Sequence, residues 1–285
     1  MEKLILAIIL MSVSLVTTAS TKVIYGDDNR VDVYKSTNAD FVELSKSTAA
    51  MIPNASIKKA FGSKTYKIKA KSLESRGICK TERFAKQPSA ANCSGFLVGD
   101  KYLVTAGHCI RRKSDCKGSH WVFGYKMKNA TEANLEIEEE NVYRCKKIIS
   151  QSLNSSNKDD YALIELDRVA QNIRPLTFRK SGKIAEGEAI VVIGHPSGLP
   201  TKIADGANVR KLSGKYFSAN LDTYGGNSGS AVFNVATGLV EGILVRGETD
   251  YVRRGGCSQS NTIGNNSGRG EDVTFITNIE ELQNL

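Results

Sequence analysis

The stretch Cys93-Ser94-Gly95-Phe96-Leu97-Val98-Gly99-Asp100-Lys101-Tyr102-Leu103-Val104-Thr105-Ala106-Gly107-His108-Cys109 contains two short apolar runs separated by turn residues. Runs of this length, bounded by glycine and charged residues, are typical of β-strands. The stretch therefore predicts two neighbouring strands, and the second strand ends just before a histidine.

Similar short apolar runs recur in both directions from this stretch, between glycine, asparagine and serine residues. They fall at residues 121–123, 142–145, 161–164, 189–193, 231–233, 239–245 and 273–276. Many short strands favour a β-barrel or a β-sandwich. Residues 174–187 carry Pro175, Gly182 and Gly187 and are interpreted as a linker between two β halves. A short helix at 278–284 is the one helix expected after the first twenty residues.

The composition fits a soluble globular chain of one large or two modest domains. The chain has 285 residues, of which 40% are hydrophobic and 24% are charged. These values exclude collagen-like, disordered and small disulfide-scaffold proteins. The 39 Lys and Arg residues exceed the 30 Asp and Glu residues, so the net charge is +9. Such an excess suits an acidic partner surface or a polyanion.

The N-terminal residues have the organisation of a cleavable secretory signal. Met1-Glu2-Lys3 is followed by an apolar run at 4–16 and by small residues at 17–20. A run of thirteen residues is too short to cross a bilayer, which takes ~20 apolar residues. We therefore expect a signal peptide at 1–19 and a secreted chain without stable membrane insertion.

Export also favours disulfides for the cysteines, because the destination is oxidising and their number is even. No pair has the C-x-x-C spacing that would indicate zinc, and no metal site is expected. A local pair between Cys116 and Cys145 is possible, and if Cys93 and Cys109 also pair, Cys79 and Cys257 would join distant segments, but spacing alone does not decide the pairing. The six cysteines are Cys79, Cys93, Cys109, Cys116, Cys145 and Cys257.

Three segments supply the residue types of a nucleophilic hydrolase. They read Thr-Ala-Gly-His-Cys at 105–109, Asp-Tyr-Ala-Leu-Ile at 160–164 and Gly-Gly-Asn-Ser-Gly-Ser at 225–230. A serine hydroxyl needs a neighbouring base, and that base needs a carboxylate to orient it. The candidates are Ser228, His108 and Asp160. Asp160 is preferred to Asp159 because it immediately precedes the apolar strand, whereas Asp159 is interpreted as a solvated loop charge.

The glycines around Ser228 suit a hydroxyl presented on a tight turn. A chain without bulky side chains allows the backbone N–H groups of Gly226 and Ser228 to face a developing oxyanion. The other two histidines are interpreted as structural residues. His195 lies in a turn next to Pro196, and His120 is expected in a surface loop.

Together these segments closely resemble the trypsin/chymotrypsin family of serine endopeptidases, over about residues 76–276. Gly-Asn-Ser-Gly-Ser and the compact second half are most similar to the bacterial branch with the staphylococcal glutamyl endopeptidases. The resemblance implies an all-β fold of two antiparallel Greek-key β-barrels with the active site between them. It also implies that His108 is the general base, Asp160 its orienting carboxylate and Ser228 the nucleophile. Gly226 and Ser228 would form the oxyanion hole, Cys93 and Cys109 a disulfide, and no cofactor is needed.

The resemblance also suggests how the chain is divided. We expect the signal peptide at 1–19, an N-terminal arm or propeptide at 20–75, the first barrel at 76–178 and the second barrel at 179–285. Residues 23–30 resemble the mature start of the glutamyl relatives, which favours the arm.

Specificity is predicted from the residues around the pocket of related enzymes. Asp222 falls where trypsin-like members have the carboxylate of the pocket floor, which implies cleavage after Arg or Lys. Alternatively, Asp222 bonds to backbone or to an arginine such as Arg246. Glutamyl specificity is the rival, although Leu244 stands where those relatives have a histidine. With that specificity, Thr223 and Arg246 would partly neutralise the carboxylate of the substrate. For either specificity, the backbone of Val245, Arg246 and Gly247 is expected to pair with an extended substrate.

We therefore expect a secreted, monomeric serine endopeptidase that acts on proteins or peptides and binds no nucleic acid. The rival from another class is a non-catalytic protein on a protease fold that binds polyanions through its positive charge. The acidic residues Glu136, Glu138, Glu139 and Glu140 lie where some relatives bind calcium, but a solvated charged loop is the preferred interpretation.

Overall fold

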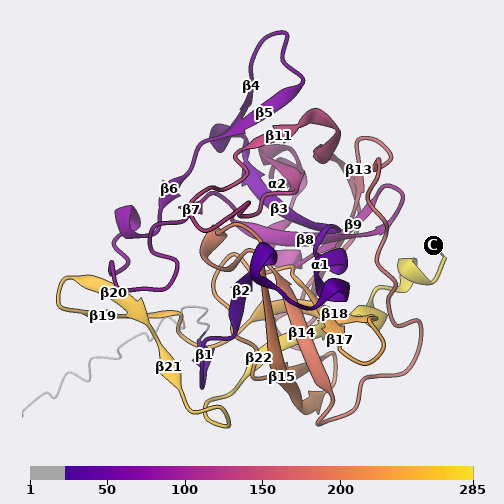
Figure 1. The fold of residues 1–285 in the computed structure, drawn as a ribbon. Coiled ribbons are helices and arrows are strands. Elements are labelled where there is room, and N and C mark those ends of the chain that lie inside the picture. Colours follow the sequence, from indigo (N-terminus) through magenta and orange to yellow (C-terminus); the bar gives the residue numbers. More distant parts are fainter. Residues whose placement is uncertain (1–22, 285) are drawn as a thin grey trace, which may run out of the picture.

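The computed structural model describes residues 23–284, so the expected signal peptide at 1–19 lies outside the described residues. Two groups of strands lie one above the other in Figure 1; the chain begins with β1 and β2 at the lower group, passes through the upper group and returns to the lower one. The architecture is all-β, as expected, with two antiparallel barrels.

The first barrel is a closed ring of six antiparallel strands. In order around the ring these are β10 (Ser119–Phe123), β12 (Val142–Leu153), β13 (Asp160–Leu166), β9 (Tyr102–Thr105), β8 (Cys93–Gly99) and β3 (Thr48–Pro53). The strands β8 and β9 are the two predicted from the opening stretch. They pair antiparallel, with Phe96 opposite Val104, and their apolar side chains fill the barrel together with Trp121.

The second barrel is also a ring of six strands, and a seventh strand is added to it. The ring consists of β14 (Ala189–Gly194), β17 (Ala231–Asn234), β18 (Val240–Arg246), β22 (Glu271–Phe275), β16 (Tyr216–Ala219) and β15 (Lys202–Ser213). Pairing of β15 with β14 closes this ring. The added strand, β2 (Arg30–Asp32), pairs with the first residues of β15.

The N-terminal segment is built into both barrels. While β2 joins the second barrel, β3 forms a full strand of the first and pairs with β8 and β10. The first barrel therefore begins well before residue 76, where the sequence analysis placed its start. The sequence analysis missed this strand because β3 lies far from β8 along the chain, and only the closed ring brings the two strands together.

Shorter elements cover the barrels. The small sheets consist of β1 (Ile24–Tyr25) with β21 (Thr262–Ile263), β4 (Ile57–Lys59) with β5 (Thr65–Ile68) and β11 (Glu136–Glu138), β6 (Lys71–Ser72) with β7 (Pro88–Ser89), and β19 (Tyr251–Arg254) with β20 (Cys257–Ser260). Residues 23–284 contain two short α-helices, α1 (Ala39–Ser45) and α2 (Lys113–Gly118). The expected C-terminal helix is a 3-10 helix at Glu280–Asn284. Among the described residues, none of the helices has the length and apolarity needed to span a membrane.

All six cysteines form disulfides. Cys93 is bonded to Cys109, as the resemblance implied. The pair Cys116 and Cys145 is local to the first barrel, and Cys79 with Cys257 ties the loop between β6 and β7 to strand β20. The structure therefore contains the pairing considered from the sequence, in which Cys116 and Cys145 pair locally and Cys79 and Cys257 join distant segments.

Candidate active site

His108 and Asp160 meet because their strands are neighbours. His108 follows the end of β9, and Asp160 is the first residue of the antiparallel partner β13. The Asp160 carboxylate accepts the backbone N–H of His108 at 3.1 Å and lies 2.9 Å from Nδ1 of its ring. Asp160 is buried, whereas His108 is about one-quarter exposed. Two contacts therefore fix the orientation of an imidazole that still reaches the surface.

Gly107 allows this turn to approach the next strand closely. A Cβ at position 107 would lie 2.0 Å from the carbonyl oxygen of Ser152. The Gln151 side chain also donates to the carbonyl oxygen of Gly107, at 3.2 Å. Glycine at position 107 is thus required for packing of the histidine turn against β12.

Asp159 is not the solvated loop charge that the sequence suggested. Its side chain is buried and accepts a 2.8 Å hydrogen bond from Asn278. Burial raises the pKa of the Asp159 carboxyl above its usual value. Asn278 comes from the last part of the chain, so only the folded structure provides this partner.

Ser228 lies on a tight turn between the two barrels. Gly226 in this turn has φ +95°, and a Cβ there would lie 2.5 Å from the carbonyl oxygen of His195. Only glycine fits this position without strain. The hydroxyl of Ser94 donates to the carbonyl oxygen of Gly226 at 2.8 Å and accepts the backbone N–H of His195 at 3.0 Å. A first-barrel strand therefore supports the turn that carries Ser228.

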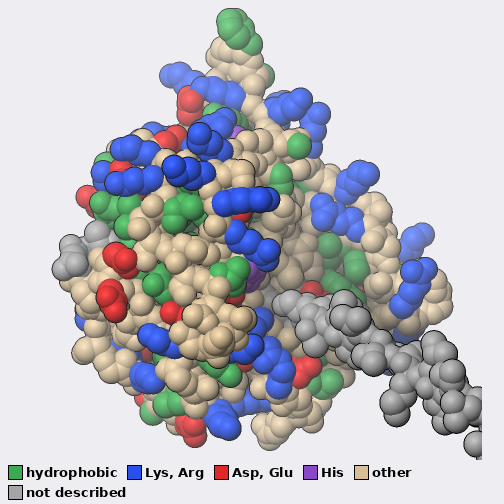
Figure 2. Space-filling model, turned by 180° about the vertical axis from the view of Figure 1, so that it is seen from behind, with side chains coloured by type: hydrophobic (Ala, Val, Ile, Leu, Met, Phe, Trp, Pro, Cys, Tyr) green, Lys and Arg blue, Asp and Glu red, His purple; other side chains and the backbone are tan. Residues whose placement is uncertain are grey.

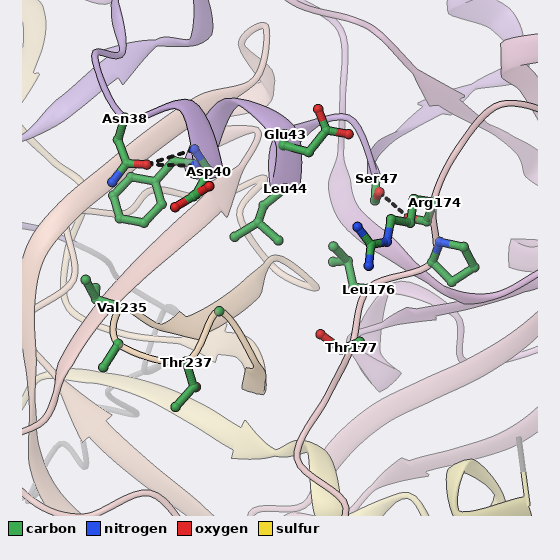
Figure 3. Close-up of a pocket in the computed structure, with 14 residues that line it drawn as sticks. Asn38, Asp40, Glu43, Leu44, Ser47, Arg174, Leu176, Thr177, Val235 and Thr237 are labelled. Carbon is green, nitrogen blue, oxygen red and sulfur yellow. Dashed lines mark hydrogen bonds between the residues drawn. The ribbon is translucent and has the colours of Figure 1, made fainter.

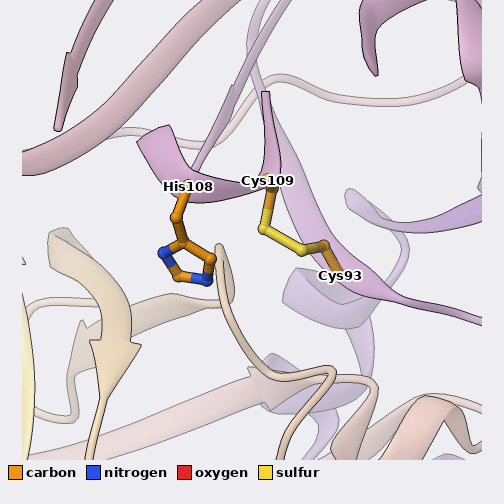
Figure 4. Close-up of side chains that lie close together, drawn as sticks. All are labelled: Cys93, His108 and Cys109. Atoms are coloured by element: carbon orange, nitrogen blue, oxygen red, sulfur yellow. A yellow bond between two sulfur atoms is a disulfide. The ribbon is translucent and has the colours of Figure 1, made fainter. Parts of the chain in front are cut away.

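The same strand connects Ser228 with the histidine. The backbone N–H of Ser94 donates to the carbonyl oxygen of Ser228 at 2.8 Å. The preceding residue, Cys93, is bonded to Cys109 beside His108, and Figure 4 shows the imidazole next to this disulfide. The candidate nucleophile turn and the candidate base thus lie against one clamped segment.

The Cys93, His108 and Cys109 side chains also lie close enough together to be considered as metal ligands. Both sulfur atoms are in the disulfide, so neither is available as a thiolate. Among residues 23–284 this is the only group of side chains close enough together to be considered for a metal, and it offers a single ligand, His108.

Two hollows flank the site. One of about 680 Å³ includes His108, Arg111 and Arg112, and another of about 370 Å³ includes Gly226 and Tyr251. A third pocket of about 360 Å³ lies elsewhere, between α1, the linker and the turn after β17. Figure 3 shows its sides, which carry none of the candidate catalytic residues.

Asp222 does not behave as an open pocket floor. One carboxylate oxygen accepts the backbone N–H of Tyr25 and the other accepts that of Asn29, both at 2.8 Å. Burial raises the pKa of Asp222 to about 6, although the two N–H groups oppose this shift. The alternative of a bond to backbone is therefore the one that the structure shows, and Asp222 anchors the N-terminal arm.

Arg246 faces the acidic residues of the site instead of a substrate path. Its guanidinium donates to Asp272 at 2.9 Å and lies 3.6 Å from the Asp160 carboxylate. It also donates to the carbonyl oxygen of Lys158 at 2.6 Å. The family resemblance placed Arg246 beside the substrate, but its partners Asp160 and Asp272 lie on strands that only the fold brings near.

Thr223, Val245 and Gly247 lie together with a carboxylate that the sequence analysis missed. Thr223 is fully buried and donates its hydroxyl to Glu271 at 2.6 Å. Val245 is buried in β18, and a Cβ at Gly247 would lie 2.0 Å from a Glu271 oxygen. The available signal was an acidic residue, Glu271, just before the apolar run at 273–276.

The remaining histidines are both buried. His195 is fully buried, its Nδ1 lies 3.0 Å from the carbonyl oxygen of Leu199, and its ring stacks on Tyr125. The expectation of a surface loop for His120 is wrong, because His120 lies in β10 with 3% exposure and packs near Tyr66. Burial lowers the pKa of each histidine to about 4.

The acidic run is engaged with lysines. Glu136, in strand β11 of a small sheet, pairs with Lys67 at 2.8 Å, and Glu139, in the 3-10 turn that follows this strand, pairs with Lys59 at 2.5 Å. The pairing of these carboxylates with lysines agrees with the preferred interpretation of the acidic run as solvated surface charges.

The two-barrel architecture with this histidine turn and serine turn defines a chymotrypsin-like fold. Residues 93–243 match the family described as "Trypsin-like peptidase domain". The chain therefore belongs to the trypsin-like peptidase domain family, a family of serine proteases.

A solved structure with a similar fold supports this assignment at low sequence identity. One, described as a Glu endopeptidase in complex with MPD, has 17% identity and a TM-score of 0.56, and the match covers 92% of this chain and 98% of that chain. Another, an inactive mutant protein from M. tuberculosis, has 12% identity and a TM-score of 0.48 over 91% of this chain and 94% of that chain. None of the curated protein sequences matches this chain.

Proposed function

We propose that this protein is a secreted serine endopeptidase in which Ser228, His108 and Asp160 act as a catalytic triad. The observation that carries the proposal is the 2.9 Å contact between His108 Nδ1 and the buried Asp160 carboxylate. Such a contact holds the histidine in the tautomer whose Nε2 can accept a proton from a serine hydroxyl.

The proposed reaction has two stages. Ser228 Oγ attacks the peptide carbonyl carbon while His108 accepts the hydroxyl proton, and the backbone N–H groups of Gly226 and Ser228 stabilise the oxyanion. His108 then donates that proton to the leaving amine, and an acyl-enzyme remains. A water molecule then attacks the acyl carbon while His108 accepts its proton; the ester bond to Ser228 breaks, the carboxylic acid product leaves, and His108 returns the proton to the serine oxygen. The protein is proposed to work as a monomer on protein or peptide substrates.

Secretion is proposed from the signal-like residues 1–19 and is supported by the cysteines. All six cysteines are paired in disulfides, and none of them is a free thiol. Such complete pairing is characteristic of proteins that fold in oxidising compartments.

The test compares the mature protein with its Ser228→Ala variant on a mixed peptide library, with cleavage sites assigned by mass spectrometry. We expect cleavage by the wild type and at least a ~10³-fold slower reaction in the variant. Thr201→Ala is a matched control, because it also removes a buried hydroxyl but lies on a different segment. Equal cleavage by wild type and Ser228→Ala would exclude the proposed nucleophile.

A non-catalytic polyanion-binding function is the alternative, favoured by the surface charge. Figure 2 shows lysine and arginine side chains over much of one face, with fewer acidic ones among them. Binding to heparin-agarose would weaken with salt and would be the same for Ser228→Ala as for the wild type. An intact peptide library together with such binding would favour this alternative.

A further inference from the structure

A hairpin in the second half of the chain contacts the turn that carries Ser228. It consists of β19 and β20, residues 251–260, and Asp250 directly precedes its first strand. The Asp250 carboxylate accepts the backbone N–H of Gly225 at 2.8 Å. Gly225 precedes Gly226, whose N–H group is proposed to stabilise the oxyanion. An acidic side chain is thus bonded to the backbone next to the proposed oxyanion hole.

Two consecutive glycines allow this backbone to take more than one orientation. Neither Gly225 nor Gly226 has a Cβ, so the peptide group between them can rotate with little steric resistance. None of the peptide bonds in residues 23–284 is cis, and a trans peptide group points its C=O and its N–H in opposite directions. The direction of the Gly225 carbonyl therefore decides where the Gly226 N–H points.

Ser197 holds that carbonyl. The backbone N–H of Ser197 donates to the Gly225 carbonyl oxygen at 2.6 Å. Ser197 has φ +53°, in the left-handed region that residues other than glycine rarely adopt. Two further bonds fix Ser197 in this conformation: its hydroxyl shares a 2.7 Å hydrogen bond with the Tyr251 hydroxyl, and its carbonyl oxygen accepts the Ser89 hydroxyl at 2.6 Å. The Gly226 N–H therefore points away from Ser197.

The hairpin is itself anchored, so the positions of Asp250 and Tyr251 are fixed. The Tyr251 ring stacks on Tyr224, with ring centroids 4.7 Å apart. At the base of the hairpin, the backbone N–H of Asn261 donates to the Asp250 carbonyl oxygen at 2.8 Å. Near its tip, the disulfide of Cys257 ties the hairpin to the loop between β6 and β7. The contacts to the glycine pair thus come from a segment that is held at both ends.

We propose that Asp250 and Tyr251 are positioning residues, which hold the peptide group of Gly225–Gly226 with its N–H directed at the oxyanion of the reaction. Asp250 bonds to the N–H of Gly225, and Tyr251 acts on the carbonyl side through Ser197. A donor stabilises a developing oxyanion best when its direction is fixed in advance, because a mobile dipole must reorganise as the charge forms. This inference rests on the proposed endopeptidase function.

The first test measures kcat and KM for Asp250→Ala and Asp250→Asn on one peptide that the wild type cleaves. In Asp250→Ala the Gly225 N–H loses its acceptor, and we expect kcat to fall about 10- to 100-fold, less than the ~10²- to 10³-fold cost of losing a whole oxyanion donor. KM should change by no more than about twofold, because the oxyanion forms only in the transition state. Asparagine keeps an acceptor oxygen at the same place, so Asp250→Asn should recover most of kcat.

Glu248→Ala is the matched control. The Glu248 carboxylate belongs to the same loop and also accepts a backbone N–H, that of Arg269 at 2.8 Å. This bond lies away from the glycine pair, so kcat of Glu248→Ala should change by no more than about twofold. Equal losses of kcat in Asp250→Ala and Glu248→Ala, or in Asp250→Ala and Asp250→Asn, would overturn the inference.

A second measurement isolates the oxyanion. With a peptide aldehyde, Ser228 Oγ bonds to the aldehyde carbon, the C=O double bond becomes a single bond, the hydroxyl proton moves to His108, and the former aldehyde oxygen carries the negative charge. The matching peptide alcohol binds without forming this bond. Asp250→Ala should weaken inhibition by the aldehyde about as much as it lowers kcat, and inhibition by the alcohol by no more than about twofold. Equal weakening of both inhibitors would contradict a positioning role.

Tyr251→Phe keeps the proposal testable even if Asp250→Ala fails to fold. This variant removes only the hydroxyl that bonds to Ser197, and it should lower kcat and aldehyde affinity together by about 5-fold. Wild-type aldehyde affinity in Tyr251→Phe would overturn the role of the hairpin. If the wild type cleaves no peptide and its Ser228 does not react with a fluorophosphonate, the endopeptidase itself is rejected. An active wild type with unchanged kcat in Asp250→Ala rejects the positioning role alone.

Discussion

The first barrel holds its part of the proposed site by contacts among its own strands, whereas the second barrel depends on a distant segment. His108 and Asp160 come from the adjoining ends of β9 and β13, and the disulfide of Cys93 with Cys109 clamps the histidine turn. In the second barrel, β2 from the N-terminal arm is added to β15, and Asp222 is bonded to the arm backbone.

Buried charge shows the same difference. Lys202 at the start of β15 is 2% exposed and pairs with Asp32 of β2 at 2.7 Å. Burial lowers the pKa of Lys202 to about 8, although Asp32 opposes the shift. The candidate His108–Asp160 pair is thus a product of one barrel, whereas Asp222 and Lys202 of the second barrel find their partners only in the N-terminal arm.

The largest effect is expected when the contribution of the first barrel to the proposed site is removed. Asp160→Asn should lower kcat by about 10⁴-fold, because the amide cannot hold His108 in the required tautomer. Asp159→Asn, one residue earlier in the chain, removes a carboxylate that bonds to Asn278 instead of His108, and its kcat should change by no more than a few-fold. Steady-state kinetics on one peptide measures both. Similar losses in the two variants would mean that Asp160 acts only through folding.

The second largest effect is expected when a substitution weakens the attachment of the N-terminal arm to the second barrel. Lys202→Met leaves Asp32 buried without its cation and should lower the free energy of unfolding by about 3–5 kcal/mol. Lys211→Met removes an exposed lysine from the same strand and should change it by no more than about 0.5 kcal/mol. Urea denaturation measures the difference. If the two variants are equally stable, the arm is not held by this ion pair.

The smallest effect is a pH dependence at His195, which lies where the barrels meet. Its folded-state pKa of about 4 lies below the ordinary value of 6.5, so only the unfolded chain binds this proton between those pH values. Stability should therefore fall as the pH falls through this window, by about 3 kcal/mol at most from this group. His195→Gln should remove that part of the pH dependence, as measured by denaturation at pH 7 and pH 4.5. An unchanged pH dependence would show that another group is responsible.

Local patterns were sufficient to predict the strands and the pairing of His108 with Asp160. A short apolar run between turn residues forms a strand in either barrel, and the two polar residues lie at the ends of two such runs. The same reasoning failed for His120 and Asp159, because their burial comes from Tyr66 and Asn278, which lie far away in the chain. It also missed β3, which has no neighbour in sequence that marks it as part of the first barrel.

The sequence by itself determined the class of the protein, because the histidine, aspartate and serine segments are each recognisable from a few consecutive residues. The tertiary structure alone decided which acid faces which partner. Asp222 and Glu271 are both acids close to short apolar segments, and nothing in the neighbouring residues predicts their different partners. Their surroundings differ because the arm backbone satisfies Asp222, whereas the pairing of β22 with β18 and β16 brings Glu271 against Thr223 and Gly247.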